Sequence, residues 1–456
     1  MRVVHRANTC FSIFSEKYHI LFDPWLNGPA VAQGWTQFPP ASKKIEEIPK
    51  PDLVYISHIH SDHCESTTLD GIDKETPIII MDLPPNFLHK MLIGKGFKNI
   101  FALAPNKLHK LDGFNDLEFE VFGAGGDHIA ANIIDSGMIM QIEGKVIFNF
   151  NDNHPTEDQC YLFKERYPDI DLAFIPDGGG SGYPAMYGNL DLEEKKEIFN
   201  QAMDRFNKAF TKAVEILQPA TAIPVAGGFA IRGDHPIETN YLQVRHLDQT
   251  KIINFVRDNS NVTSNIIPMQ PDMELDINQH KITTGSYTPW KKDQLDSFFR
   301  KISKEKIVKN VETNAKTPGL TKMLNTARAN MWKAQENFKL FPDYKVFLSI
   351  EDYDILYEIE MNTNTLLETN SIDRSTPYLK ISAEQDTFLE WIMGYEDFNM
   401  LDSGHRLKFF REPNIYEVEA YFLLSLLELS FLVLKLYRLQ CQFFLKFHLK
   451  ELLVFF

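Results

Sequence analysis

The sequence predicts an α/β fold with a C-terminal α+β extension, and three observations support this prediction. Short apolar runs rich in β-branched residues alternate with helical patterns through the first half of the chain. The loops that follow these runs are rich in His, Asp and Gly, as in scaffolds whose loops carry chemistry. After about residue 255, Lys-rich helical segments precede new strand-like runs. We therefore expect one domain over residues 1–255, an accessory α+β region over 256–420 and a hydrophobic tail over 421–456.

Five short apolar runs in the first half are typical of buried strands, because each is bounded by polar, Gly or Pro residues. They cover residues 53–56, 78–81, 146–150, 172–175 and 221–225. A helix is expected over 191–217, since Asp191 suits its N-cap and apolar residues recur at helical spacing until Pro219. In the accessory region, helical patterns over 291–340 precede strand-like runs over 346–350 and 355–359.

The composition is that of a globular protein with an acidic surface. Apolar residues make up 44% of the chain, which is enough to build a large core and excludes disorder as its main character. Acidic residues outnumber basic residues by 62 to 47, giving a formal net charge of −15. This charge argues against nucleic acid as a partner, because such binding needs basic surface. A local basic pocket for an anionic small-molecule substrate is compatible with it.

The four cysteines lie far apart and form no C-x-x-C pair, which predicts a reducing compartment without a disulfide framework. The N-terminal sequence lacks the sustained apolar stretch of a signal peptide. No segment has the roughly 18 uncharged apolar residues that a membrane span requires. We therefore expect a cytoplasmic protein and no membrane as a partner.

The tail from residue 420 to 456 is rich in Leu and Phe and contains no Gly or Pro. Six charged residues interrupt it, which makes it a poor membrane span. Three interpretations stay open at this point. It could be a buried or oligomer-forming helix, a membrane-surface helix favoured by its basic residues, or an out-of-frame ending of a truncated gene.

The segment His58-Ile59-His60-Ser61-Asp62-His63 contains the strongest chemical signal in the sequence. Three imidazoles and one carboxylate follow directly after a predicted strand, so several ligands share one loop. Imidazole and carboxylate suit zinc or iron. His58 and His60 can converge on one ion if the chain stays extended, while Asp62 and His63 turn towards a second position. We therefore expect a metal site here.

One loop cannot complete two metal sites, so further ligands are expected in the loops after later strands. Candidates are His128 in a Gly-Gly-Asp-His segment, Asp152 directly after the predicted strand 146–150, and His235 in Gly-Asp-His-Pro. His154 is the main rival for a ligand role, and we expect it to contact the substrate or a ligand instead. The Gly-rich segment 178–182 either cradles a phosphate with its backbone or forms a tight loop near the metals.

The H-x-H-x-D-H pattern, followed in order by His, Asp and His, resembles the signature of the metallo-β-lactamase superfamily. The resemblance implies a four-layer αββα sandwich with two metal ions at one edge. It further implies that one ion is bound by His58, His60 and His128, that the second is bound by Asp62, His63 and His235, and that Asp152 bridges the two.

Within that superfamily, several segments resemble the metallohydrolase part of CMP-N-acetylneuraminic acid hydroxylase. They include the Asp-Pro-Trp-Leu segment within residues 21–30, the Gly-rich segment 177–184 and residues 226–229. That family carries a Rieske iron–sulfur domain, which needs C-x-H and C-x-x-H pairs. None of the four cysteines has His two or three places after it. We therefore expect no electron supply from within this chain.

These features predict a dinuclear metal-dependent hydrolase that uses a metal-bound hydroxide on a phosphorylated, nucleotide-linked, ester or lactone small molecule. Zinc is the expected metal, with iron and manganese as alternatives. Asp62 or Asp152 would orient the nucleophile, and His154 or Tyr183 would help to protonate the leaving group. The alternative is a di-iron oxygenase component similar to the hydroxylase, which would need an external electron-transfer partner. A catalytically silent binding protein is a third possibility, disfavoured by the complete ligand set.

Overall fold

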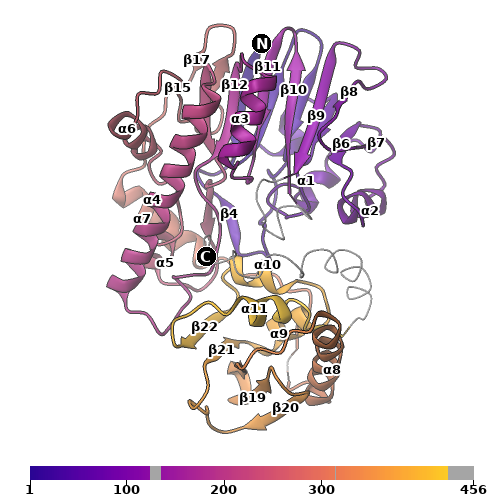
Figure 1. Ribbon diagram of the computed structural model, residues 1–456, viewed down its shortest axis with the longest axis vertical. Helices are drawn as coiled ribbons and strands as arrows, with labels where there is room; N and C mark the ends of the chain where they lie inside the picture. Colours follow the sequence, from indigo (N-terminus) through magenta and orange to yellow (C-terminus); the bar gives the residue numbers. More distant parts are fainter. Residues whose placement is uncertain (124–134, 314, 430–456) are drawn as a thin grey trace. The chain divides into compact units, whose positions relative to one another are not determined.

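The computed structural model describes residues 1–123, 135–313 and 315–429, and it divides into two compact units (Figure 1). The first unit comprises residues 1–30, 35–180 and 199–304. The second comprises residues 31–34, 181–198 and those from 305 onward.

The first unit contains an eight-stranded sheet in the order β17-β16-β1-β2-β3-β5-β6-β7. The strands are β1 (Arg2–Ala7), β2 (Cys10–Phe14), β3 (His19–Phe22), β5 (Leu53–Tyr55), β6 (Ile78–Met81), β7 (Ile100–Leu103), β16 (Glu274–Asp276) and β17 (Lys281–Thr284). From β3 to β7 neighbouring strands are parallel, so their carboxyl ends meet at one edge of the sheet. The loop that carries the predicted metal ligands begins at this edge, and its first predicted ligand, His58, lies three residues after the end of β5.

A seven-stranded sheet in the order β15-β13-β12-β11-β10-β9-β8 forms the other half of the unit. The strands are β8 (Leu108–His109), β9 (Leu117–Gly123), β10 (Ser136–Ile142), β11 (Lys145–Asn149), β12 (Leu172–Pro176), β13 (Thr221–Val225) and β15 (Asn265–Ile266). β11, β12, β13 and β15 are parallel, whereas β10 runs antiparallel to both β9 and β11. The start of β10 therefore lies at the edge where β11 ends.

The two sheets share one apolar core, and helices cover their outer faces. Phe11, Phe22 and Tyr55 of the first sheet belong to the same buried cluster as Phe119 and Phe174 of the second. Helices α3 (Glu157–Arg166), α4 (Leu192–Leu217) and α6 (Thr250–Asn259) cover the seven-stranded sheet (Figure 1). Helices α1 (Ser66–Asp70) and α2 (Phe87–Gly94) cover the other sheet. The predicted four-layer αββα sandwich is confirmed.

The remaining elements of this unit are short. Strands β4 (Trp35–Gln37) and β14 (Phe229–Ile231) pair with each other, and the unit also contains the 3-10 helix η1 (Ile45–Glu47) and helices α5 (Ile237–Tyr241) and α7 (Lys292–Ile302). The predicted N-cap of α4 is present, because Asp191 Oδ1 accepts hydrogen bonds from the Glu193 and Glu194 N–H groups.

The first compact unit extends to residue 304, whereas the sequence suggested a boundary at residue 255. Residues 256–304 complete the first unit, since β15 pairs with β13 and β16 pairs with β1. These pairings join segments far apart in sequence, so a change in local composition does not reveal them.

The second unit is an α+β structure built on a five-stranded sheet in the order β20-β19-β18-β21-β22. The strands are β18 (Lys345–Ile350), β19 (Ile355–Glu360), β20 (Thr365–Thr369), β21 (Tyr378–Ala383) and β22 (Lys408–Glu412). The helices are α8 (Leu320–Phe338), α9 (Gln385–Ile392), α10 (Phe398–Ser403) and α11 (Val418–Leu424), with a 3-10 helix at Glu351–Tyr353. The predicted α+β extension is confirmed.

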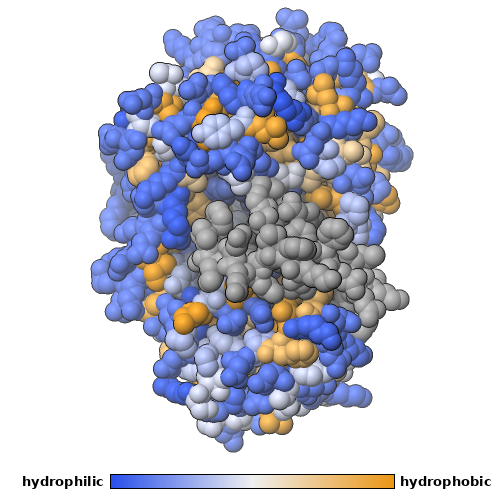
Figure 2. Space-filling model, viewed as in Figure 1, coloured by the Kyte–Doolittle hydropathy of each residue, from blue (hydrophilic) through white to orange (hydrophobic). Residues whose placement is uncertain are grey.

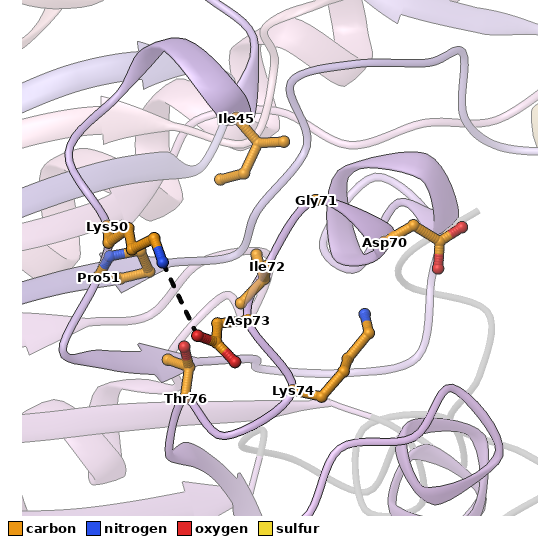
Figure 3. Close-up of a pocket in the computed structure, with 9 residues that line it drawn as sticks. All are labelled: Ile45, Lys50, Pro51, Asp70, Gly71, Ile72, Asp73, Lys74 and Thr76. Atoms are coloured by element: carbon orange, nitrogen blue, oxygen red, sulfur yellow. Dashed lines mark ion pairs between the residues drawn. The ribbon is translucent and has the colours of Figure 1, made fainter.

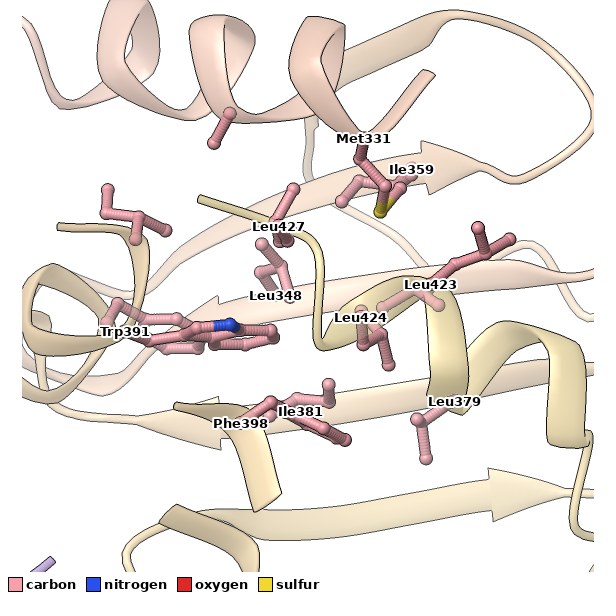
Figure 4. Close-up of a cluster of buried hydrophobic side chains, with 14 of the residues drawn as sticks. Met331, Leu348, Ile359, Leu379, Ile381, Trp391, Phe398, Leu423, Leu424 and Leu427 are labelled. Carbon is pink, nitrogen blue, oxygen red and sulfur yellow. The ribbon is translucent and has the colours of Figure 1, made fainter. Parts of the chain in front are cut away.

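The first residues of the hydrophobic tail belong to the core of this unit. Leu423, Leu424 and Leu427 are buried with Trp391 of α9 and Leu348 of β18, as Figure 4 shows. The tail's later residues, 430–456, lie outside the described part of the chain, and so does Cys441. Up to Leu429, the described tail is therefore a structural part of the second unit.

The face drawn in Figure 2 is mostly hydrophilic, with apolar residues scattered among the polar ones, as the net charge of −15 suggests. Among the helices of the described ranges, none combines the length and the apolar character that crossing a membrane requires.

Replacing Leu424 by Ala should destabilise the second unit, because it removes a fully buried side chain and leaves a cavity. The expected loss is about 2–5 kcal/mol in the free energy of unfolding, measured by urea denaturation of the full chain. Leu367→Ala is the matched control, since that leucine is 58% exposed and should change stability by less than about 0.5 kcal/mol. Equal effects of the two substitutions would contradict this packing.

The stability of the second unit should also depend on pH through Asp402. Burial raises the pKa of this carboxyl to about 7, although the Gly182 N–H and the Arg411 guanidinium favour its ionised form. The unfolded chain releases this proton near pH 4, so the stabilisation is present below that pH and is lost as the pH rises to about 7. Asp402→Asn should match the parent chain at pH 4 and exceed it at pH 8, by at most about 4 kcal/mol. Parallel stability–pH curves for the two proteins would refute this.

Candidate metal centre

The loop after β5 brings three imidazoles together with carboxylates from other segments. One group of potential ligands consists of His58, His63 and Asp152, whose ligand atoms all lie within 4.8 Å of one another. Asp152 follows β11, so the carboxyl-terminal edges of both sheets supply this group. The predicted convergence of the loop with Asp152 is thus present in the structure.

A second group consists of His58, His60 and Asp135 and satisfies the same distance limit. His58 Nε2 lies 3.0 Å from His60 Nδ1 and 3.6 Å from an Asp135 carboxylate oxygen. Sequence reasoning missed Asp135, because it considered only residues after strands, and Asp135 directly precedes β10. The antiparallel pairing of β10 with β11 brings Asp135 to the edge where β11 ends. Predicting a β-hairpin over residues 136–149 would therefore have identified Asp135 as a candidate ligand.

Two side chains behind the loop fix the orientation of its histidines. Asp23 Oδ2 lies 3.1 Å from His63 Nδ1, which directs His63 Nε2 towards Asp152 Oδ2 at 3.2 Å. Ser57 Oγ hydrogen-bonds with His58 Nδ1 at 2.9 Å and leaves Nε2 of that ring for the centre. Outer carboxylates of this kind orient metal-ligating histidines and raise their basicity. Asp23 of the Asp-Pro-Trp segment is therefore placed to orient the His63 ring.

The charges in this cluster are strongly coupled. Burial opposes protonation of His63, but Asp152, Asp62 and Asp23 together hold its pKa well above the usual value. Burial lowers the pKa of His58, and the neighbouring His63 and His60 lower it further. Without a metal, one protonated imidazole is therefore held among several carboxylates.

Two buried carboxylate oxygens of the ligand groups, Asp135 Oδ1 and Asp152 Oδ1, have no hydrogen-bond partner among the described residues. Unsatisfied buried acceptors are costly, and a cation that accepts their lone pairs removes the cost. The donor set of imidazole nitrogens and carboxylate oxygens also suits zinc, iron or manganese. The residues present therefore fit a bound metal.

The other three predicted metal ligands, Asp62, His235 and His128, belong to neither ligand group found among the described residues. Asp62 is buried, with Oδ2 3.4 Å from His63 Nε2. Burial raises the pKa of Asp62, but His63, His60 and a backbone N–H together hold it below its usual value. His235 lies between β14 and α5, and neither ligand group found among the described residues includes it. His128 lies outside the described residues. The ligand roles of these three residues stay predictions, as do those of the predicted ligands that the two groups contain.

The predicted catalytic residues lie in different units. His154 donates from Nε2 to the Gly178 carbonyl at 2.9 Å and packs on the Phe206 ring in the first unit. Tyr183 belongs to the second unit, where the Arg411 guanidinium lies 4.6 Å from its ring centroid. The catalytic role of Tyr183 stays a prediction.

The Gly-rich segment is tightly packed. A Cβ atom on Gly180 would lie 2.2 Å from the Trp35 ring, and one on Gly178 would lie 2.8 Å from Cδ of Arg245. Glycine is therefore required here by the close approach of neighbouring side chains, which favours the tight-loop interpretation over a phosphate cradle.

A separate surface hollow of about 340 Å³ lies around residues 70–76 (Figure 3). Lys50 and Asp73 form an ion pair of 3.8 Å across it. None of its lining residues belongs to either ligand group, so it is not part of the metal centre.

Comparisons with known proteins find similarity in sequence and in structure. Residues 18–224 match the family model described as the beta-lactamase superfamily domain. Cytidine monophosphate-N-acetylneuraminic acid hydroxylase of Mus musculus is 30% identical over 275 residues, which cover 58% of this chain and 45% of that protein. The same hydroxylase of Xenopus laevis is 25% identical over 273 residues, covering 58% and 44%. A solved structure of Igni18, described as a metallo hydrolase from Ignicoccus hospitalis, has a TM-score of 0.41 and 17% identity over 60% of this chain and 97% of that one.

Residues 18–224 therefore form a domain that resembles the metallo-β-lactamase superfamily, as the family model, the H-x-H-x-D-H loop and the αββα sandwich together indicate. Within the superfamily it resembles cytidine monophosphate-N-acetylneuraminic acid hydroxylase, as the sequence motifs indicated. The chain spans less than half the length of these hydroxylases.

Replacing His58, His60 or Asp135 by Ala should weaken metal binding at least ~10-fold while the fold persists, since each offers a potential ligand atom in one of the two groups. Metal content of the purified full chain is measured by mass spectrometry, and folding by circular dichroism. His109→Ala is the control, because His109 hydrogen-bonds to the Ala104 carbonyl and belongs to neither group. Unchanged metal stoichiometry in the three variants would rule out this centre.

Proposed function

We propose that this protein is a dinuclear metal-dependent hydrolase of a phosphorylated, nucleotide-linked, ester or lactone small molecule. The observation that carries the proposal is the gathering of five potential ligands, His58, His60, His63, Asp135 and Asp152, in two overlapping groups, with buried carboxylate oxygens that lack partners. Metal ions bound there supply a water of lowered pKa and positive charge for a developing oxyanion. Zinc is the proposed metal, with iron and manganese as alternatives.

Carboxylates near His63 can orient the attacking water molecule and accept its proton. Asp62 and Asp152 both lie within 3.4 Å of His63, where either carboxylate can orient a water molecule and accept its proton. Asp23 holds the His63 ring in place from the opposite side.

His154 is suited to move a proton. Burial lowers its pKa, so the neutral ring is favoured, and the bond from Nε2 to the Gly178 carbonyl leaves Nδ1 as the acceptor. A neutral His154 can therefore take up a proton at Nδ1 and return it to a leaving group. This refines its predicted role as a proton donor.

A di-iron oxygenase component is the second candidate. The similarity to cytidine monophosphate-N-acetylneuraminic acid hydroxylases favours it, and the same imidazole and carboxylate ligands suit iron. An external electron-transfer partner would then be needed. That partner, the small-molecule anionic substrate and the cytoplasmic location stay predictions.

Asp62→Asn should lower hydrolysis at least ~100-fold, because it removes a charge that favours the ions and accepts a proton. The assay is a panel of phosphodiesters, nucleotide sugars and lactones, run without oxygen on the zinc, manganese and iron forms. Asp70→Asn is the control, since the Asp70 side chain is 61% exposed on α1 and pairs with Lys95. Metal content is measured in both variants.

Two results of this assay would overturn the hydrolase proposal. One is product that forms only with oxygen and a reductant and carries a new hydroxyl group, which would establish the oxygenase. The other is full hydrolytic activity of Asp62→Asn with its metal retained.

A further inference from the structure

Arg245 is a cation that the first unit holds without a carboxylate partner. Its Nε donates to the Gly179 carbonyl at 3.0 Å, and one terminal nitrogen donates to the Met203 sulfur at 2.9 Å. Among the described residues no acidic side chain forms an ion pair with it. The Asp177 carboxylate, which attracts it electrostatically, is instead 2.5 Å from His246.

The surroundings of this guanidinium favour an anion. Its carbon lies 4.4 Å from the Phe206 ring centroid and 5.5 Å from that of Phe199, so aromatic rings displace much of its water. Burial lowers its pKa to about 10, and the nearby Arg205 acts in the same direction. Arg205 is a second cation nearby, and the Asp177 carboxylate, which favours the charged guanidinium, contacts His246.

The position of Arg245 connects it with the metal centre. His154 and Arg245 pack on the same Phe206 ring and donate to the consecutive carbonyls of Gly178 and Gly179. His154 lies two residues after the potential ligand Asp152. The close approach of Gly178 to Cδ of Arg245 also fixes the course of the side chain.

We propose that Arg245 binds an anionic group, a phosphate or a carboxylate, of the small molecule on which the metal centre acts. The remaining N–H groups of the guanidinium match the paired oxygens of either anion. The role as a substrate anchor rests on the proposed function, whereas anion binding at Arg245 does not.

The test is calorimetric titration of inorganic phosphate and of acetate into the full chain, in both the metal-loaded and the chelator-treated form. Arg245→Met, which keeps the length of the side chain and removes its charge, should weaken binding of the preferred anion at least ~10-fold. Arg205→Met removes the same charge from an exposed position on α4 and should change affinity less than ~3-fold. Arg245→Lys should bind with intermediate affinity, because it keeps the charge and loses the planar fork.

Several results would overturn this proposal: no binding of either anion to the parent chain, unchanged affinity in Arg245→Met, or an equal loss in Arg205→Met. If Arg245→Met does not fold, unchanged affinity in Arg245→Lys has the same force. Anion binding to the metal-free protein that depends on Arg245 would support the proposal even if no substrate is hydrolysed. The outcome is thus separate from that of the hydrolase assay.

Discussion

The first unit depends on one electrostatic constraint, the concentration of carboxylates around a few imidazoles at the edge of its two sheets. The carboxylates are those of Asp23, Asp62, Asp135 and Asp152, and the imidazoles are those of His58, His60 and His63. Burying like charges together is unfavourable unless opposite charge balances them. Without metal, protonation of His63 supplies one positive charge. A divalent cation bound at His63 Nε2 would replace that proton and supply more positive charge. The fold therefore gathers potential metal ligands and also buries negative charge that a bound metal ion would neutralise.

This constraint also explains why ligands come from distant parts of the sequence. β5 belongs to the eight-stranded sheet and β11 to the seven-stranded sheet. The carboxyl end of each strand is followed by a loop that carries potential metal ligands. Asp23, after β3, supports His63 from behind, so three strand ends and the start of β10 contribute to one cluster. The apolar core between the sheets holds these ends in register.

Local patterns in the sequence were sufficient for much of this architecture. The apolar runs at β5, β6, β11, β12 and β13 and the helix α4 were predicted from periodicity and bounding residues, and the His-rich loop was recognised by its ligand density. Features that depend on long-range pairing were not predictable in this way. Asp135 reaches the centre only through the antiparallel pairing of β10, and residues 256–304 join the first unit through β15 and β16. The leucines near residue 424 gave no local sign of the sheet that they cover.

The proposed hydrolysis and the proposed anion binding use two different parts of the first unit, the ligand groups and Arg245. The ligand groups provide the reactive edge, whereas Arg245 provides charge of the opposite sign to a substrate anion, with His154 and Phe206 linking them.

The central claim is that metal ions bind between the named side chains. It is tested most directly by a crystal structure of the metal-loaded chain with anomalous scattering recorded at the metal edge. The account predicts anomalous peaks about 2.0–2.2 Å from His58 and His63 nitrogens and from an Asp152 carboxylate oxygen. Peaks elsewhere on the chain, with these atoms hydrogen-bonded only to water, would contradict it.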